Sequence, residues 1–505
     1  MPKGVVLAPI DRVERDASTP VSFIGGESDA KWHAFAPKGI WGGRLGGMTR
    51  AIMWFRRDLR LNDNPALLAA LADHSDVLPL FVVDPFLVSR SGRPRLAYMS
   101  AALSALDTAL DGALTIRIGD PVEVIPDLAA DLDCHDVYVA KDFAPYGQRR
   151  DREVAARLTA AGRRLRGVGS PYAVDPGRVT KDDGSSYSVF TPFSKRWLAE
   201  GWSAPLDAPL QPTWISAAGV DVAIDEALGH PSVDFDLLPH SEEAVQDQWD
   251  EFRLRGPEGL DGYADRRNDP GVPGSSRLSA ALRWGIVHPR QLLADLQPIK
   301  SHDTYRSELA WREFYADVLY RFPDTGWRNL NRKMDGLVHD SGPVAEQRFA
   351  AWCRGETGYP IVDAGMRELV TTGWMHNRVR MIVASFLVKD LHLPWQWGAK
   401  FFMQHLVDGD LASNAHGWQW TAGTGTDAAP YFRVFNPVLQ GERYDPNGDY
   451  VRRFVPEVAE LPANQIHAPF DAKRKGAGVP LGYVAPIVDH SVERDEALAR
   501  YKAME

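Results

Sequence analysis

GWMHNRVRM, at residues 373–381, places Arg, Asn and Trp together where the core of a helical region is normally apolar. DGD at residues 408–410 and NAHGWQW at residues 414–420 repeat this mixture. If these segments are helices, spacings of three and four residues put Asn377, Arg380 and Met381 on one face, and Asn414 with Trp418 on another. A buried charge is costly unless it is paired. We therefore expect these faces to line a large polar cavity that holds a cofactor and a substrate.

A third segment shows the same periodicity further upstream. Its aromatic and ionisable residues are Tyr305, Glu308, Trp311, Arg312 and Tyr315. Three helices, each with a mixed aromatic and charged stripe, are thus predicted to form the walls of one site.

The composition is that of an ordinary globular protein, with 505 residues, 44% hydrophobic and 25% charged. Two cysteines, Cys134 and Cys353, are too few for a disulfide framework, so a reducing cytoplasm is expected and a metal site is not. Because the chain has neither a basic, apolar leader at its start nor a run of ~20 apolar residues, we expect neither export nor membrane insertion.

Charge is unevenly distributed along the chain. The net charge is −10, but residues 203–251 contain eleven acidic residues and no Lys or Arg. The rest of the chain is nearly neutral, so net charge does not exclude DNA as a partner, because a local basic groove decides phosphate binding.

The pattern of apolar runs predicts two kinds of structure. Residues 1–47 resemble a disordered extension before Met48. Over residues 48–175, strand and helix patterns alternate, which predicts a doubly wound parallel sheet. The predicted strands are at 51–55, 77–83, 114–118, 136–140 and 164–168, and the predicted helices include 97–110 and 146–161. Residues 176–255 are expected to be an acidic interdomain linker. Residues 256–505 predict a helical domain, with helices at 305–321, 364–372, 377–391 and 398–407.

The first strand runs into a charged loop, WFRRDLRLNDNP at residues 54–65, and a helix is expected to begin at Asn64-Pro65. Ligands of parallel sheets bind beyond the carboxyl ends of the strands, so the loop is a candidate ligand site. A salt-bridge cluster between domains explains the same residues equally well. GxGxxG and Walker sequences are absent, so ordinary dinucleotide or triphosphate binding has no support.

These motifs resemble the DNA photolyase and cryptochrome family. The resemblance also includes SELAWREFY at 307–315, TGYPIVDAGMREL at 357–369 and FNP at 435–437. Within this family, the chain is most similar to class I cyclobutane pyrimidine dimer photolyases. The resemblance extends from Arg50 to about Val488.

The resemblance implies an FAD cofactor in the helical domain. Alone, the segment GSSRLS at 274–279 indicates only the start of a helix. The positions that match the family's flavin site are Tyr263, Ser275, Ser276, Arg277, Leu278, Ser279, Tyr305, Arg312, Arg380, Asp408, Gly409, Asp410 and Asn414. Asn414 matches the residue that faces flavin N5.

The resemblance also implies a DNA lesion as substrate. The matching lesion and DNA positions are Arg267, Glu308, Trp311, Asn377, Arg378, Met381, Trp420 and Gln440. Taken alone, Trp311 and Trp420 are more typical of core packing. The implied reaction is light-driven: reduced flavin donates an electron to a flipped-out dimer, both cyclobutane bonds open, and the electron returns. The resemblance implies Glu308, Asn377, Trp418 and Trp395 as the catalytic residues.

Trp418 and Trp395 match the inner two of the three tryptophans through which the family reduces its flavin. His339 stands at the outermost position, so we expect photoreduction to stall or to follow another indole, with Trp327 and Trp352 as candidates.

A second, antenna chromophore is also implied. KDFAPYG at 141–147 and FVVDP at 81–85 resemble the deazaflavin-type branch of the family more than its folate-type branch. This resemblance implies that Asp84, Arg95 and Asp142 lie near an 8-hydroxy-5-deazaflavin, although Ala144 replaces an acidic residue of that branch. Methenyltetrahydrofolate, or no antenna, is the alternative.

Four functions therefore remain open. The first is a monomeric repair lyase that acts on dimer-containing DNA. The second is a cryptochrome-type blue-light sensor. The third, a (6-4) repair enzyme, is disfavoured because Asn377 stands where that branch has a further His. The fourth is a flavoprotein without a role on DNA.

Overall fold

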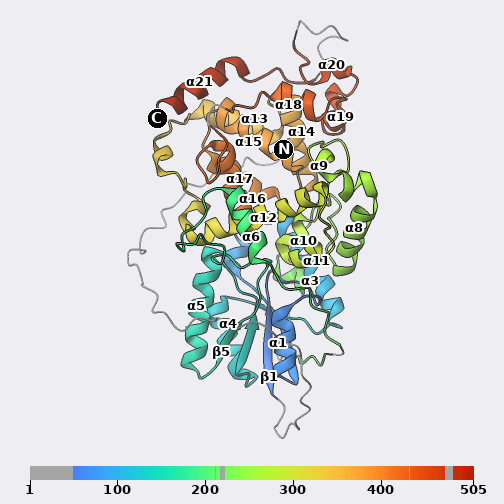
Figure 1. Ribbon diagram of the computed structural model, residues 1–505, viewed down its shortest axis with the longest axis vertical. Helices are drawn as coiled ribbons and strands as arrows, with labels where there is room; N and C mark the ends of the chain where they lie inside the picture. The colour runs from blue at the N-terminus through green and yellow to red at the C-terminus, as the bar shows by residue number, and fades with distance from the viewer. Residues whose placement is uncertain (1–48, 211, 217–221, 431–432, 472–481, 505) are drawn as a thin grey trace. The chain divides into compact units, whose positions relative to one another are not determined.

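The computed structural model describes residues 49–210, 212–216, 222–430, 433–471 and 482–504 (Figure 1). The predicted extension over 1–47 lies outside them. The described chain opens with a parallel sheet in the order β3-β2-β1-β4-β5. Its strands are β1 (Arg50–Phe55), β2 (Asp76–Val83), β3 (Thr115–Ile118), β4 (Asp136–Val139) and β5 (Arg164–Gly167). All five predicted strands are confirmed.

Both faces of the sheet are covered, which explains why the central strands β1, β2 and β4 are mostly apolar and buried, whereas the edge strand β5 is polar and partly exposed. Met53 and Phe55 of β1 belong to a core cluster with the α3 helix, and Ile52 and Trp54 belong to a second cluster with α4 and α5. This alternation is the two-residue period of a strand. The helices of the region are α1 (Pro65–Asp73), α2 (Pro85–Val88), α3 (Arg93–Ala109), α4 (Pro121–Asp131) and α5 (Pro145–Ala160). The doubly wound arrangement is therefore confirmed.

The acidic stretch is more ordered than its composition indicated. The segment expected to be a linker contains α6 (Phe190–Glu200), α7 (Ile224–Ala227) and α8 (Glu242–Leu254). Val245, Trp249 and Phe252 of α8 are buried in the core, at helical spacing. The acidic residues that hide this periodicity in the sequence occupy the remaining faces of α8. The acidic interdomain linker predicted over 176–255 thus contains three helices, and α8 packs into the core.

The second half of the chain is helical. Its α-helices are α9 (Tyr263–Arg266), α10 (Ser279–Trp284), α11 (Pro289–Ala294), α12 (Lys300–Arg321), α13 (Pro343–Arg354), α14 (Pro360–Thr372), α15 (Asn377–Ser385), α16 (Trp395–His405), α17 (Leu411–Ala422), α18 (Pro437–Tyr444), α19 (Asp449–Phe454), α20 (Ala463–Ile466) and α21 (His490–Lys502). Short 3-10 turns cover Gly256–Glu258, Leu260–Gly262, Pro323–Gly326, Arg332–Gly336 and Pro456–Val458.

The helix predicted over 377–391 is not one continuous α-helix. The α-helical part ends at Ser385, and Phe386–Asp390 forms a π-helical turn. Such turns insert one residue into a helix and cannot be recognised from apolar spacing. The other three predicted helices are confirmed, and α12 begins five residues earlier than expected.

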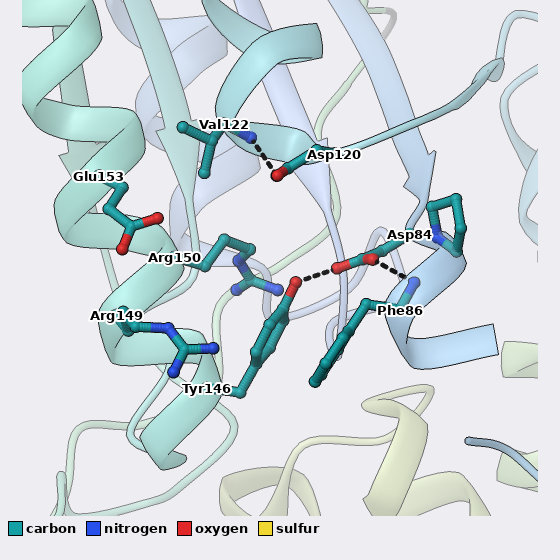
Figure 2. Close-up of a pocket in the computed structure, with 9 residues that line it drawn as sticks. Asp84, Phe86, Asp120, Val122, Tyr146, Arg149, Arg150 and Glu153 are labelled. Atoms are coloured by element: carbon teal, nitrogen blue, oxygen red, sulfur yellow. Dashed lines mark hydrogen bonds between the residues drawn. The ribbon is translucent and has the colours of Figure 1, made fainter. Parts of the chain in front are cut away.

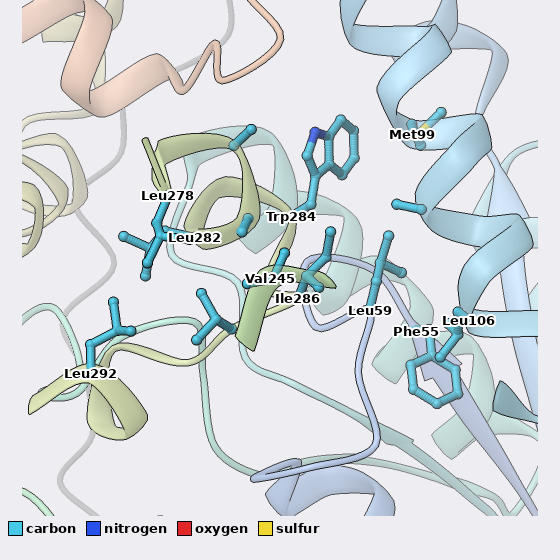
Figure 3. Close-up of a cluster of buried hydrophobic side chains, with 14 of the residues drawn as sticks. Phe55, Leu59, Met99, Leu106, Val245, Leu278, Leu282, Trp284, Ile286 and Leu292 are labelled. Carbon is cyan, nitrogen blue, oxygen red and sulfur yellow. The ribbon is translucent and has the colours of Figure 1, made fainter. Parts of the chain in front are cut away.

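One continuous core joins the sheet to the helical region (Figure 3). Phe55 and Leu106 from the sheet region, Val245 from α8, and Leu282 and Ile286 from the α10 segment are all buried in it. Since apolar packing is dense and resists deformation, this core fixes the position of the β1–α1 loop, through Leu59, relative to α10 and α12.

Candidate functional site

Helices α12, α15 and α17 carry the three predicted stripes, and α17 packs against both of the others. Most of the stripe residues are neither fully buried nor fully exposed: Glu308, Trp311, Arg378, Arg380, Met381, Asn414 and Trp420 are partly accessible. Asn377 is exposed at the first position of α15. The structure therefore brings the predicted residues to one group of packed helices, with accessible side chains.

Glu308 on α12 is paired with Arg267, which follows α9. The Arg267 Nη1 atom lies 2.6 Å from Glu308 Oε1, and 30% of the Glu308 side chain is accessible. Burial raises the pKa of Glu308, and the charges of Arg267 and Arg378 oppose that rise. Two influences therefore oppose each other at Glu308: burial favours the neutral acid, and the ion pair with Arg267 favours the carboxylate.

Trp311 belongs to a group of packed aromatic rings. One face of its indole stacks on Phe190 of α6, with ring centroids 3.8 Å apart and planes 9° from parallel, and its ring centroid lies 5.3 Å from that of Tyr315. Phe190 is in turn held by its backbone N–H, which donates to Asp427 in the loop after α17. The simple core-packing interpretation of Trp311 therefore accounts for one face of the indole, and the residue remains partly accessible.

Arg378 is held by two neutral groups. Its Nη2 donates to Asn268 Oδ1 at 2.7 Å, and its guanidinium lies 4.5 Å from the centre of the Tyr444 ring. Tyr444 ends α18, the helix that also carries the partly exposed Gln440. The positive charge of Arg378 is therefore not neutralised by the side chain to which it is bonded.

Arg380 and Asp408 form a second charge pair deeper in the helical region. Arg380 Nη2 lies 2.7 Å from Asp408 Oδ2, and Arg380 Nε donates to the Met375 carbonyl at 2.8 Å. Oδ1 of Asp408 is buried and accepts no hydrogen bond from any residue that the structure describes. Asn414 donates from its side-chain amide to the Ala399 carbonyl at 2.9 Å, which fixes the plane of the amide.

Asp410 connects the sheet region to α17. It caps α17 by accepting from Ser413 N–H at 3.1 Å, and its Oδ2 lies 2.8 Å from Arg57 Nη2 and 3.8 Å from Arg283 Nε. Burial acts to raise the pKa of Asp410, but the charges of Arg57, Arg283 and Arg312 hold it well below the usual range. For Arg57, the structure favours the salt-bridge interpretation of the charged loop.

The GSSRLS segment contacts α12 and the connection between α14 and α15. The Ser276 and Tyr305 hydroxyls are 2.8 Å apart, and Ser279 Oγ accepts from the Trp374 indole at 3.2 Å. Ser275 is partly exposed and Leu278 is buried. The segment ends in α10, as its interpretation as a helix start predicts.

The other predicted cofactor residues are described by their backbone conformation or by their contacts within the protein. Arg277 has a positive backbone φ of 54°. Tyr263 packs edge-on against Tyr305, with centroids 5.1 Å apart. Arg312 donates to the carbonyls of Pro171 and Leu282, at 3.0 and 3.1 Å. The Gly409 carbonyl accepts from Arg283 Nε at 3.0 Å.

Trp418 and Trp395 are both buried. The Trp395 indole donates to Asn329 at 2.8 Å. Trp418 packs over Gly398, and its ring also lies edge-on to Trp352, with centroids 6.1 Å apart. Trp352 and Trp327 are the two candidates for an alternative outer tryptophan in flavin photoreduction. Trp352 is in direct contact with Trp418, whereas Trp327 is 52% exposed.

A pocket of about 330 Å³ opens at the carboxyl end of the sheet, lined by Asp84, Phe86, Asp120 and Tyr146 among others (Figure 2). Asp84 caps α2 by accepting from Phe86 N–H at 2.8 Å, and it also accepts from the Tyr146 hydroxyl. Phe86 and Tyr146 stack with centroids 4.9 Å apart.

The three predicted antenna residues do not share one set of contacts. Asp142 lies 3.4 Å from Arg150 of α5, whose side chain also lines the pocket. Arg95 instead points toward α16 and α17, with Nη1 3.5 Å from the Gly409 carbonyl. Asp84 and Asp142 are therefore both tied to α5, and Arg95 is not.

Comparison with known proteins places this geometry in context. Residues 51–212 match the family model described as DNA photolyase, and residues 305–503 match the FAD binding domain of DNA photolyase. A deoxyribodipyrimidine photo-lyase from Agrobacterium fabrum is 39% identical over 477 residues, which are 90% of this chain and 98% of that protein. This chain belongs to the DNA photolyase family.

Solved structures of the family share the fold. A class III photolyase from Agrobacterium tumefaciens aligns with a TM-score of 0.81 at 36% identity, covering 92% of this chain and 99% of that one. A Synechocystis cryptochrome aligns with a TM-score of 0.81 at 28% identity, covering 91% and 100%. Fold alone thus does not separate repair enzymes from light sensors in this photolyase family.

Sequence reasoning missed several residues that complete the site. Phe190, Asn268 and Tyr444 support Trp311 and Arg378, and Arg283 approaches Asp410. Each lies far along the chain from its partner, so no local spacing could have shown the contact. Separately, among the described residues, no helix has the length and apolar character needed to cross a bilayer.

Proposed function

We propose that this photolyase-family chain uses light and bound FAD to split cyclobutane pyrimidine dimers in DNA. The observation that carries the proposal is the partly accessible Trp311, held by its stack on Phe190, on the same helix as the partly accessible Glu308, whose carboxylate pairs with Arg267. A partly accessible indole suits a flipped-out base, because stacking on an aromatic side chain contributes ~1–3 kcal/mol per base. A damaged base pair also costs less to unstack.

The roles of the lesion residues follow from their chemistry. Trp311 and Trp420 provide stacking surfaces, and Met381 adds apolar contact. Asn377 at the start of α15 offers an amide to the pyrimidine edge. Arg378, whose side chain contacts the neutral Asn268 and Tyr444, binds a backbone phosphate, and Arg267 and Gln440 extend the DNA contact.

The residues present also suit a flavin. Asp408 has a buried carboxylate oxygen with no hydrogen bond from the described residues, and Arg380 beside it is a donor that a flavin carbonyl can use. Asn414 would lie against the isoalloxazine ring, and Ser275, Ser276 and Ser279 would serve the phosphates. When bound and excited, reduced FAD supplies an electron to the dimer and recovers it after both bonds open.

Two further roles rest on the same proposal. Trp418 and Trp395, with Trp352 as the alternative branch, carry electrons toward the flavin. The pocket that contains Asp84 is the candidate antenna site, and 8-hydroxy-5-deazaflavin remains the favoured ligand. Because Arg95 turns away from that pocket, an antenna there would depend on Asp84 and on the α5 residues.

The test is a repair assay on an oligonucleotide that contains one thymine dimer. Purified protein with bound FAD is reduced and incubated with the oligonucleotide under blue light or in darkness, and the intact thymines are quantified by chromatography. The proposal requires repair in light and none in darkness.

A cryptochrome-type sensor is the second candidate, because the Synechocystis cryptochrome shares the fold at a TM-score of 0.81. A sensor would photoreduce its flavin under the same light and leave the dimer unchanged. That outcome would favour the sensor and contradict the repair proposal.

A further inference from the structure

The ion pair between Arg267 and Glu308 lies in an accessible part of the molecule. Its atoms are 2.6 Å apart, and 24% of the Arg267 side chain and 30% of the Glu308 side chain are accessible. Arg267 follows the four-residue α9 helix, while Glu308 lies within the 22-residue α12 helix. Arg267 is therefore on the shorter and less anchored of the two elements, and a charged ligand can reach it.

The charges around Glu308 are unevenly balanced. The groups that act on it are Arg267 and Tyr263 from the α9 segment, Arg378 from α15, and Tyr305 and Tyr315 from its own helix. Burial raises the pKa of all three tyrosines, so they are neutral near pH 7. Two arginines thus face one carboxylate, and the side chain that accepts from Arg378 is the neutral Asn268.

We propose that Arg267 is a latch on Glu308: a DNA phosphate draws Arg267 away, and Glu308 then takes up one proton from the acid form of the solvent buffer and donates it in a hydrogen bond to a carbonyl oxygen of the dimer. This inference rests on the proposed repair function and specifies how substrate binding prepares the site. One O–H bond forms on Glu308, the bond between that proton and the buffer acid breaks, and no oxidation state changes.

Three physical arguments support this order of events. Guanidinium groups bind phosphate with paired, charge-assisted hydrogen bonds, so a phosphate competes well with Glu308. A desolvated carboxylate that loses its neighbouring cation favours the neutral form. Only the neutral form can donate a hydrogen bond, because an ionised carboxylate is solely an acceptor. In the free protein Glu308 is therefore unable to donate to a pyrimidine carbonyl, and binding makes it able to do so.

The measurement is proton uptake on binding, in darkness. The protein is titrated with dimer-containing duplex in a calorimeter at one pH, in buffers of different ionisation enthalpy. The slope of heat against ionisation enthalpy gives the protons taken up. We expect the wild-type protein to take up as much as one proton more per complex than Glu308→Gln.

Variants of Arg267 separate the latch from other sources of protons. Arg267→Gln should take up no more than Glu308→Gln, since its Glu308 is already neutral before DNA binds. Infrared spectra of the free Arg267→Gln protein should then show a protonated carboxyl band that the free wild-type protein lacks, a readout that needs no DNA. Arg267→Lys keeps the charge and should retain the uptake. Arg494→Gln is the matched control, because Arg494 is exposed and pairs with its exposed neighbour Asp495.

The outcomes distinguish this inference from the proposed function. If wild type and Glu308→Gln both bind the dimer and take up equal numbers of protons, the latch is wrong and the repair proposal stands. If Arg267→Gln keeps the wild-type uptake, Arg267 is not the latch. If no variant or wild-type protein prefers dimer-containing DNA, the proposed function itself fails.

Discussion

Asp410 links the charged loop after β1 to the helix that carries Asn414, and two substitutions separate its contributions to stability. Asp410→Asn keeps the shape and the cap of α17 but removes the charge. Asp410→Ala removes both. The comparison therefore measures the ion pair with Arg57 and the helix cap independently.

The magnitudes follow from the contacts. Removing one partner of a buried ion pair costs ~3–5 kcal/mol, and loss of a helix N-cap costs ~0.5–2 kcal/mol. Arg57 and Asp410 are 15% and 16% exposed, which favours the lower part of the first range. We expect the free energy of unfolding to fall by ~3 kcal/mol in Asp410→Asn and by ~4 kcal/mol in Asp410→Ala.

The pH dependence has a definite sign. Because the folded pKa of Asp410 is held below its unfolded value, the extra stability is present above about pH 4 and is lost as the pH falls toward the folded pKa. Urea unfolding followed by tryptophan fluorescence measures the difference between wild type and Asp410→Asn at several pH values. If that difference is below ~1 kcal/mol at pH 7, or does not shrink in acid, the assigned role of the pair is wrong.

Three further predictions concern the aromatic residues. Trp352→Phe should slow flavin photoreduction by an external reductant, because the Trp352 ring touches Trp418. A photoreduction rate equal to that of wild type under continuous blue light would exclude electron transfer through Trp352. Phe190→Ala should weaken binding to dimer-containing DNA by ~1 kcal/mol or about fivefold, because Trp311 loses the ring that orients it. Undamaged DNA is the control. An unchanged affinity for dimer-containing DNA would show that Phe190 does not support Trp311. Gly398→Ala should destabilise the protein by ~1–3 kcal/mol, since a Cβ there would lie 2.0 Å from a Trp418 ring atom. An unaltered midpoint of thermal unfolding would contradict the close packing of Trp418 on Gly398.

The fold could be predicted wherever the signal is local. Each buried strand of the parallel sheet is a short apolar run, so the strand positions followed directly from the sequence. α8 was missed because its acidic residues mask the buried positions Val245, Trp249 and Phe252. The π-helical turn at 386–390 was missed because it changes hydrogen bonding without changing composition.

The site could be predicted as a set of residue types on three helices, but not as a set of contacts. The pairing of Arg57 with Asp410 joins residues 353 positions apart. The stacking of Phe190 on Trp311 likewise depends on how α6 packs against α12. Contacts of this kind are set by tertiary packing, which periodicity within one helix does not describe.

The most direct test of the central claim is the electron balance of turnover. Fully reduced protein is given an excess of dimer-containing DNA under blue light in the absence of air, and the split dimers are counted against the reductant consumed. The account predicts many dimers split per protein molecule with no net loss of reductant, because the electron returns after each cycle. Consumption of reductant in proportion to the dimers split, or no splitting at all, would contradict it.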